Sequence, residues 1–518
     1  MIQPDDLAIA NLKFLLLCFE SMSGLRINFH KSEVMVLGNP DLDRHRIANM
    51  LNCKLGEFPF TYLGLPISDR ALTAGDWGPL PMKVAKRADP WMGNMMSTAA
   101  RLTLIDACHS SLPLHAMGVC LLGDGVHGAM NKHRARFFWG DSRTRRRYHW
   151  VRWADMCLPK DLGGLGIMDT RRMNKCLMAK WIWRLYAGEQ GLWADILWNK
   201  YLRDKDLLVD SHTYGSQFWK SIQKVKDVFR LGAKHNIGNG YSTRLWLDWW
   251  IGPGPLSESF PEIFSITSEP EITIADALQP EGWDIPCRRA FGHVEQNQWV
   301  NLLRTLEPTR LTPAPDRITW ALEPSGRFTA RSLYRKLCEG TPRRHFCEIW
   351  RIAVPRKIKV FLWQLIRKRL SSNDNIHHRR DPSSGRCALC GEFEDTNHIF
   401  FTCSLAKFMW SAVRELFQCD WNPTCFPDVY RELCRHTGLA KRVLWTCCAA
   451  LVWSLWTTRN KFTIEGVYPA QPADILYKLA MYLQVWKPVA RRQDRVMVEL
   501  TISRIRQLYT QVREAPAP

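Results

Sequence analysis

The stretch that decides the fold is GRCALCGEFEDTNHIFFTCSLAKFMW, residues 385–410. It has the spacing C-x2-C-x7-H-x4-C, which gives four candidate ligands, Cys387, Cys390, His398 and Cys403. Zn²⁺ in proteins prefers four such sulfur and nitrogen ligands in a tetrahedron. Because four protein ligands leave no coordination position for water, we expect a structural Zn²⁺ and not a catalytic one. Four unrelated buried side chains are the alternative, and this spacing is uncommon by chance.

The whole chain is long, basic and rich in apolar residues. Its 518 residues are 46% hydrophobic, and this length indicates a globular protein of roughly three to four domains. Lys and Arg number 71 against 50 Asp and Glu, a formal charge of +21. Such a surplus makes RNA or DNA the expected partner, bound largely without sequence specificity through phosphates. A basic surface without a binding role is the alternative.

The N-terminal residues do not resemble a secretory signal. MIQPDDLAIANLKFLLLCF has acidic residues before a short apolar run and no basic start. The longest apolar stretch, 443–456, is too short to cross a bilayer, so we expect a buried helix there. Many of the 17 cysteines are isolated among apolar residues, which indicates buried thiols in a reducing compartment. These features predict an intracellular protein of the nucleus or cytoplasm, with no membrane contact.

Hydrophobic periodicity predicts a mainly α protein with small β elements, an α+β fold. Residues 11–20 have a helical pattern that ends at Ser23-Gly24, and the alternating residues 25–37 predict a pair of strands. Residues 58–67, FPFTYLGLPI, predict a further strand. Apolar positions three and four apart from 75 to 179 predict helices.

The downstream half contains one irregular stretch and further helices. Residues 253–315 are rich in Pro and acidic residues, which is typical of linkers. From Arg317, ITWALEPSGRFTARSLYRKL predicts a hairpin that turns at 324–326, followed by a helix that begins near Thr329 or Ser332. Two further helical patterns cover residues 440–462 and 472–512.

Basic and aromatic residues alternate in NKHRARFFWGDSRTRRRYHWVRW, residues 131–153. Such a mixture suits single-stranded nucleic acid, whose phosphates bind cations and whose bases stack on aromatic rings. A solvated loop beside a Trp-rich core would give the same pattern, so both interpretations stay open. The candidate contacts to nucleic acid are Arg143, Arg145, Arg146 and Arg147, and the neighbouring aromatic residues are Phe137, Phe138, Trp139, Tyr148 and Trp150.

The cysteine-histidine cluster lies within a longer pattern. This pattern runs from ITW (318–320) and GRFTARSLY (326–334) through EIWRIAVPRKIKVFLWQLIRKRLSSNDNI (348–376) to KFMW (407–410). It resembles the zinc-binding module that follows the polymerase in plant non-LTR (LINE-type) retrotransposon reverse transcriptases.

Other stretches resemble further parts of the same family. FESMSGLRINFHKSEV (19–34) is similar to the last palm segment, and FPFTYLGLPIS (58–68) to the following strands that grip the primer end. Residues 137–181 resemble the downstream connection region, and IGNGYSTRLWLDWW (237–250) another shared stretch. The resemblance therefore covers nearly the whole chain.

The resemblance implies an RNA-directed DNA polymerase, but the family's catalytic aspartates should precede residues 11–20, and this sequence starts just after them. Asp5 and Asp6 follow Pro4 and precede a helical pattern, so we interpret them as helix N-terminal acids. Without carboxylates that hold two Mg²⁺ ions polymerisation should fail, so we predict no catalytic residue and no enzyme activity. Lys31 matches a family lysine near the pyrophosphate; here it should contact phosphate at most, and an exposed strand lysine is the alternative.

The resemblance divides the chain into five segments. They are the end of the palm with primer-grip-like strands (1–70), a helical thumb or connection region (71–235), a Trp/Pro-rich connector (236–315), the zinc-binding domain (316–420) and a C-terminal helical region (421–518). The predicted function is that of a truncated retrotransposon-derived protein with structural zinc and non-specific nucleic-acid binding. The alternatives are an active polymerase whose reading frame begins upstream, and a host-adopted zinc module that binds proteins.

Overall fold

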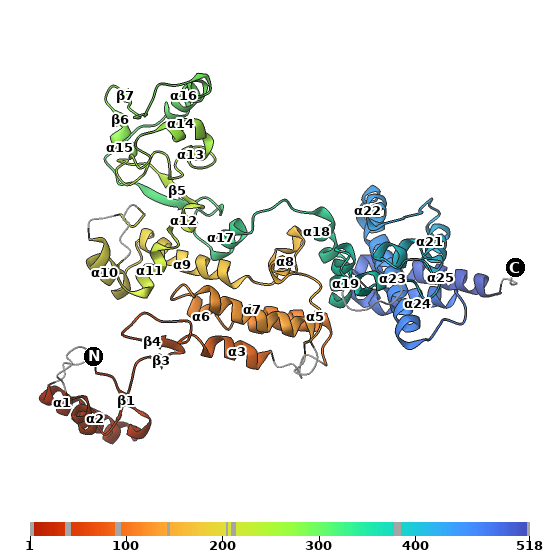
Figure 1. Cartoon of the computed structure of the whole chain (residues 1–518), viewed down its shortest axis with the longest axis horizontal. Helices are drawn as coiled ribbons and strands as arrows, with labels where there is room; N and C mark the ends of the chain where they lie inside the picture. Colours follow the sequence, from red (N-terminus) through yellow and green to blue (C-terminus); the bar gives the residue numbers. More distant parts are fainter. Residues whose placement is uncertain are drawn as a thin grey trace.

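The computed structural model is an elongated chain of many short helices (Figure 1). The structure describes residues 5–36, 43–88, 95–141, 146–203, 206–208, 214–377 and 385–514. Every sheet in these residues has two strands, and the rest of the regular structure is helical. The predicted mainly α fold with small β elements is therefore confirmed.

The N-terminal part begins with a helix whose two ends match the prediction. Its elements are α1 (Asp6–Ser23), η1 (Phe29–Lys31), β1 (Glu33–Val34), α2 (Arg44–Leu51), β2 (Lys54–Leu55), β3 (Phe60–Tyr62) and β4 (Leu65–Ile67). The Asp5 carboxylate accepts a hydrogen bond from Ala8 N at 2.7 Å and caps α1. The helix ends at Gly24, whose φ of 71° favours glycine. Asp5 and Asp6 are thus helix N-terminal acids, as interpreted.

The predicted strand pair over residues 25–37 is wrong. The Asn28 side chain accepts a hydrogen bond from Lys31 N at 3.1 Å and closes a 3-10 turn there. In the described part of this stretch only β1 is a strand, and it pairs in parallel with β2. The predicted strand over 58–67 is a hairpin of β3 and β4, because Leu63 and Gly64 both have positive φ at its turn.

The central part is helical, as the spacing of apolar residues predicted. Its elements are α3 (Pro79–Arg87), α5 (Thr98–Leu104), η2 (Ile105–His109), α6 (Leu114–Met117), α7 (Asp124–Trp139), α8 (Trp153–Cys157), η3 (Lys160–Leu162), α9 (Thr170–Tyr186), α10 (Leu192–Leu197), η4 (Trp198–Leu202), α11 (Gln217–Gln223) and α12 (Lys226–Arg230). One apolar cluster contains Met117 and Met130, and a second contains Ile182, Trp219 and Phe229.

The stretch expected to be a linker, 253–315, is folded. This part of the chain contains β5 (Ala233–Asn236), α13 (Leu256–Ser259), α14 (Pro261–Ile266), α15 (Ile274–Ala277), β6 (Leu278–Gln279), β7 (Gly282–Trp283), α16 (His293–Leu306) and β8 (Arg317–Trp320). Its helices surround their own core, in which Trp246, Leu302 and Leu306 have no exposed surface. The linker prediction is wrong because these short helices bury their apolar residues against Trp246 and not along one long periodic face.

The predicted hairpin after Arg317 is also wrong. Strand β8 pairs antiparallel with β5, so Trp320 lies opposite Ala233. The turn at 324–326 is present, since Trp320 N donates to Gly326 O at 2.9 Å, but no second strand follows it. Helix α17 (Ala330–Leu337) then begins at Thr329, whose hydroxyl accepts from Ser332 N as predicted.

The C-terminal part is a bundle around one long buried helix. Its elements after α17 are α18 (Arg344–Arg351), α19 (Arg356–Ile366), α20 (Asn373–His377), η5 (His398–Thr402), α21 (Ser404–Phe417), α22 (Phe426–Arg435), α23 (Gly438–Asn460), η6 (Lys461–Glu465), α24 (Asp474–Trp486), η7 (Lys487–Val489), η8 (Arg492–Asp494) and α25 (Arg495–Glu514). By length and composition α23 with η6 could cross a membrane, yet 67% of its most apolar window is buried in the bundle. The buried helix predicted for 443–456 is confirmed.

One hydrophobic core joins the C-terminal bundle to part of the central region. Its buried residues run from Ala88 to Ile167 and again from Phe346 to Ile505. Trp363 of α19 has no exposed surface and donates through Nε1 to Gly163 O at 2.8 Å. The residues around the cysteine-histidine cluster therefore share apolar contacts with residues more than 200 positions upstream, and the five segment boundaries stay predictions.

The turn at Gly164 gives a test of this arrangement. A Cβ at Gly164 would lie 1.8 Å from Leu158 O, a backbone atom that cannot move away alone. Gly164→Ala should therefore destabilise the protein by roughly 1–3 kcal/mol, measured as a lower thermal midpoint of the full chain. The control Gly128→Ala, at an exposed position within α7 with open space around it, should be neutral or stabilising. Equal midpoints for both variants would contradict the described turn.

Candidate metal centre

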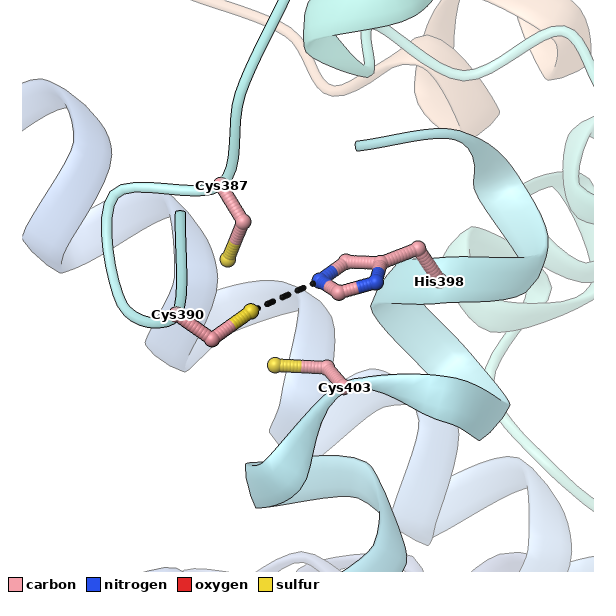
Figure 2. A group of neighbouring side chains, drawn as sticks. All are labelled: Cys387, Cys390, His398 and Cys403. Carbon is pink, nitrogen blue, oxygen red and sulfur yellow. Dashed lines mark hydrogen bonds between the residues drawn. The ribbon is translucent and has the colours of Figure 1, made fainter. Parts of the chain in front are cut away.

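The four predicted ligands come from a tight turn and from the two ends of a short helix (Figure 2). Gly391 N donates to Cys387 O at 2.9 Å, and Cys387 N donates to Glu392 O at 2.7 Å. Gly391 has a φ of 73°, which allows the chain to reverse after Cys390. The turn therefore directs two thiols, from Cys387 and Cys390, toward one side.

Helix η5 positions the other two ligands. His398 is its first residue, and the Asp395 carboxylate accepts a hydrogen bond from His398 N at 2.6 Å. Cys403 follows the last residue of η5 and precedes α21, and its N–H donates to His398 O at 2.9 Å. His398 and Cys403 are thus held at opposite ends of a single helical turn.

The structure brings all four predicted ligand side chains together. Their ligand atoms lie within 4.8 Å of one another, and Cys390 Sγ is 3.2 Å from His398 Nε2. Cys387, His398 and Cys403 are buried, while Cys390 is exposed at the edge (Figure 2). Ligands about 2.0–2.3 Å from a tetrahedral Zn²⁺ are roughly 3.5–3.8 Å from one another. The donor set and its spacing therefore fit Zn²⁺. The four side chains would fill all four coordination positions of the ion.

The thiols of this cluster interact with one another. A hydrogen bond shared with Cys403 and burial raise the pKa of Cys387 to about 11. The same hydrogen bond lowers the pKa of Cys403, and a hydrogen bond with Cys387 raises the pKa of His398. One thiol of the pair is thereby favoured in its thiolate form, which is the form that binds a metal.

A buried ion pair stands behind the cluster. Glu394 has no exposed surface, and its carboxylate pairs with Arg459 near the end of α23. Arg459 Nη2 also donates to Asn373 Oδ1 at 2.9 Å, while Asn373 N donates to Glu394 Oε1 at 3.0 Å. The Glu394 backbone N–H donates to Gly385 O at 2.9 Å. This network fixes the ligand-bearing loop against α23.

The candidate nucleic-acid contacts do not form one surface in the described residues. Arg143 and Arg145 lie outside the described residues. Arg146 and Arg147 are exposed after α7, in the central part, whereas Lys31 is exposed in η1, in the N-terminal part (Figure 1). Lys31 is therefore not on a strand, contrary to its alternative interpretation.

The aromatic residues of the basic stretch are mostly core residues. Phe137, Phe138 and Trp139 are buried in the cluster that joins the central and C-terminal parts. Tyr148 keeps 38% of its surface and packs edge to face on Trp150 at 4.8 Å. The pattern of basic and aromatic residues thus combines a buried helix end with the exposed residues 146–149.

Sequence reasoning missed two features around the centre. Glu394 and Arg459 are 65 residues apart, so no local pattern links them. Residues 343–386 contain 12 Lys or Arg and 3 Asp or Glu, which a charge count along the chain would have found. The exposed basic residues described there are Arg343, Arg344, Arg351, Lys357, Lys368, Arg369 and Arg386.

The four ligands lie in a segment that also matches a known family of zinc-binding domains. Residues 328–410 match the family described as zinc-binding in reverse transcriptase. That span contains all four candidate ligands and ends at Trp410.

Two relatives from Arabidopsis thaliana extend the similarity. A putative ribonuclease H protein is 28% identical over 412 residues, which is 76% of this chain and 65% of that protein. An uncharacterized mitochondrial protein is 30% identical over 143 residues, which is 27% of this chain and 93% of that protein. The chain belongs to this reverse-transcriptase-related family of retroelement proteins. It spans less than two thirds of the length of the first relative.

Removal of one partner of the buried pair gives a sharp test of the network. Arg459→Met leaves the Glu394 carboxylate buried without a counter-charge, and this should cost roughly 3–5 kcal/mol of unfolding free energy. The control Arg435→Met removes an ion pair with Glu432 in which the arginine side chain is 69% exposed, so it should cost about 0–1 kcal/mol. Urea unfolding of the full chain measures both. Equal losses in the two variants would show that the network does not stabilise the bundle.

Proposed function

We propose that this protein is a nucleic-acid-binding product of a plant LINE-type element that holds one structural Zn²⁺ and does not polymerise by itself. The convergence of Cys387, Cys390, His398 and Cys403 is the main observation for the zinc part of the proposal. When bound, the Zn²⁺ would link the turn after Cys387 to η5 and to the start of α21 through metal–ligand bonds. The residues supply a closed set of ligands, so the ion serves the fold and not a reaction.

Binding to nucleic acid is supported by charge and by its distribution. The formal charge is +21, and seven exposed basic residues lie in the described part of the 343–386 stretch, which precedes the cluster in the chain. Phosphate neutralisation provides affinity for RNA or DNA that is largely independent of sequence. The proposed partners are therefore RNA and DNA, and the proposed location is the nucleus or cytoplasm.

The proposal that the chain does not polymerise by itself concerns its carboxylates. Within them, the Cys₃His cluster is the one group of three or more His, Cys, Asp or Glu side chains close enough to hold a metal ion. Phosphoryl transfer with two Mg²⁺ ions requires clustered carboxylates. Asp5 cannot contribute in its observed position, because its side chain caps α1.

A second candidate is an RNA-directed DNA polymerase of which these residues are one part. This candidate follows from the resemblance of residues 19–34 and 58–68 to palm and primer-grip segments, and the putative ribonuclease H relative extends beyond the matched region. A protein-binding zinc module adopted by a host is the third candidate, and a steep dependence of nucleic-acid binding on salt would count against it.

Metal content and primer extension on the same purified chain test the main proposal. We expect about one zinc per chain and no template-dependent extension. Cys390→Ser should lower the zinc content and the thermal midpoint together, whereas Cys347→Ser, which changes a partly buried thiol outside the cluster, should leave the zinc content unchanged. Zinc that survives Cys390→Ser would refute the site. Extension by the wild-type chain would refute the absence of polymerase activity.

The loop after α7 gives a separate test. Replacing both Arg146 and Arg147 with Ala should reduce the slope of log K against log salt by up to about 0.7 for each lost phosphate contact on single-stranded RNA. The control replaces two exposed arginines of the 233–320 part, Arg304 and Arg310, and should leave the slope unchanged. An unaltered slope in the Arg146 and Arg147 variant would assign the charge-dependent binding to other residues.

A further inference from the structure

A groove lies beside the metal centre, on the side formed by α19, η5 and α22. Its volume is about 860 Å³, which is within the usual range for ligand sites. The residues that the inference uses are Lys368, Thr396, Asn397, Phe401, Tyr430 and Arg431. Thr396, Asn397 and Phe401 lie within three residues of the ligand His398, so the groove and the centre share one short segment.

Aromatic rings form the apolar wall of this groove. Phe401 is stacked against Trp410 with ring centroids 6.0 Å apart, and Tyr430 packs edge to face on His345 at 5.8 Å. Phe426 stacks along Tyr430 at 6.5 Å. These ring contacts fix the orientation of the wall before any ligand binds. A flat aromatic ligand can therefore stack there without first ordering the side chains.

The charged residues of the groove are basic. Lys368 and Arg431 line it, and no carboxylate does among the described residues. Other grooves of the described structure include carboxylates in their linings, and one of them contains Glu281, Asp284 and Glu307 beside Arg304. Arg431 contacts Asp428 at 3.4 Å, but the arginine side chain is 70% exposed, so this weak pair leaves it able to bind an anion.

Polar side chains also line the groove. Thr396 is buried and Asn397 is half-buried, and neither side chain has a hydrogen-bond partner among the described residues. An asparagine amide both donates and accepts hydrogen bonds, as the edge of a nucleobase requires. The combination of aromatic face, polar edge and basic rim matches a nucleotide within a single strand.

We propose that this groove binds one unpaired nucleobase of single-stranded nucleic acid, with Lys368 and Arg431 on the adjoining phosphates. The base stacks on the wall at Tyr430, and Asn397 contacts its edge. The basic residues between 343 and 386 carry the flanking strand. This inference rests on the proposed nucleic-acid binding and gives it a location.

The test measures binding of a single-stranded 12-nucleotide RNA to the full chain by fluorescence anisotropy. Tyr430→Leu retains apolar volume but removes the ring, so it should weaken binding by about 5- to 100-fold, the range for loss of one stacked base. An RNA of the same length with abasic positions should bind the wild type more weakly, and Tyr430→Leu should then cause little further loss. Unchanged zinc content and thermal midpoint show that the variant is folded.

The rim is tested by charge variants and a matched control. Lys368→Asn, chosen because Lys368 has a φ of 53° and asparagine tolerates that region, and Arg431→Ala should each reduce the salt slope by about 0.7. Arg435→Ala, one turn further along the same helix and outside the groove lining, should not. Photo-cross-linking of the RNA carrying 5-iodouridine should label residues 425–435.

The outcomes separate the groove from the general proposal. If wild type binds RNA with a salt slope but Tyr430→Leu binds equally well, the groove is not the base site and nucleic-acid binding stands. Cross-links confined to other segments would also show that the groove is not the base site. The groove would then suit another class of ligand, such as an apolar peptide. If wild type shows no salt-dependent RNA binding, both the groove and the proposed binding are refuted.

Discussion

The Glu394 carboxylate is fully buried next to the turn that carries Cys387 and Cys390, and it is paired with Arg459 from α23. A charge that is removed from water destabilises a fold by several kcal/mol unless a partner compensates it. Neither side chain can therefore keep its position unless the ligand loop and α23 are docked together. The candidate metal centre depends on this contact, because Glu394 lies between the two pairs of ligands in the chain.

The shared core extends this dependence through much of the molecule. Trp363 and Phe400 belong to the same buried cluster as Phe138 of α7 and Leu451 of α23. The zinc-binding segment is thus not an independently packed domain between two linkers. Its apolar residues are buried by distant upstream helices such as α5 and α7 and by helices that follow it. A metal that binds only the folded site would therefore also stabilise the surrounding helical bundle.

The sequence predicted correctly those features that depend on residues close together in the chain. The spacing of Cys387, Cys390, His398 and Cys403, the cap at Asp5 and the helix over 443–456 all depend on neighbours within a few residues. The failures have the opposite origin. Strand β8 finds its partner β5 more than 80 residues upstream, and the helices between them bury their apolar residues against Trp246. No periodicity within a short window contains that information.

The same distinction applies to the basic residues. Phe137 and Trp139 alternate with arginines in the sequence, but the fold buries these rings together with Arg134, while Arg146 and Arg147 are exposed. In the groove beside the metal centre the two chemical types line the same cavity, although Lys368, Phe401 and Tyr430 are well separated in the chain. Helix η5 is the link, since it carries His398 at its start and Phe401 within it. A metal held by His398 and Cys403 would fix both ends of this helix, so a structural ion would also determine the shape of the groove.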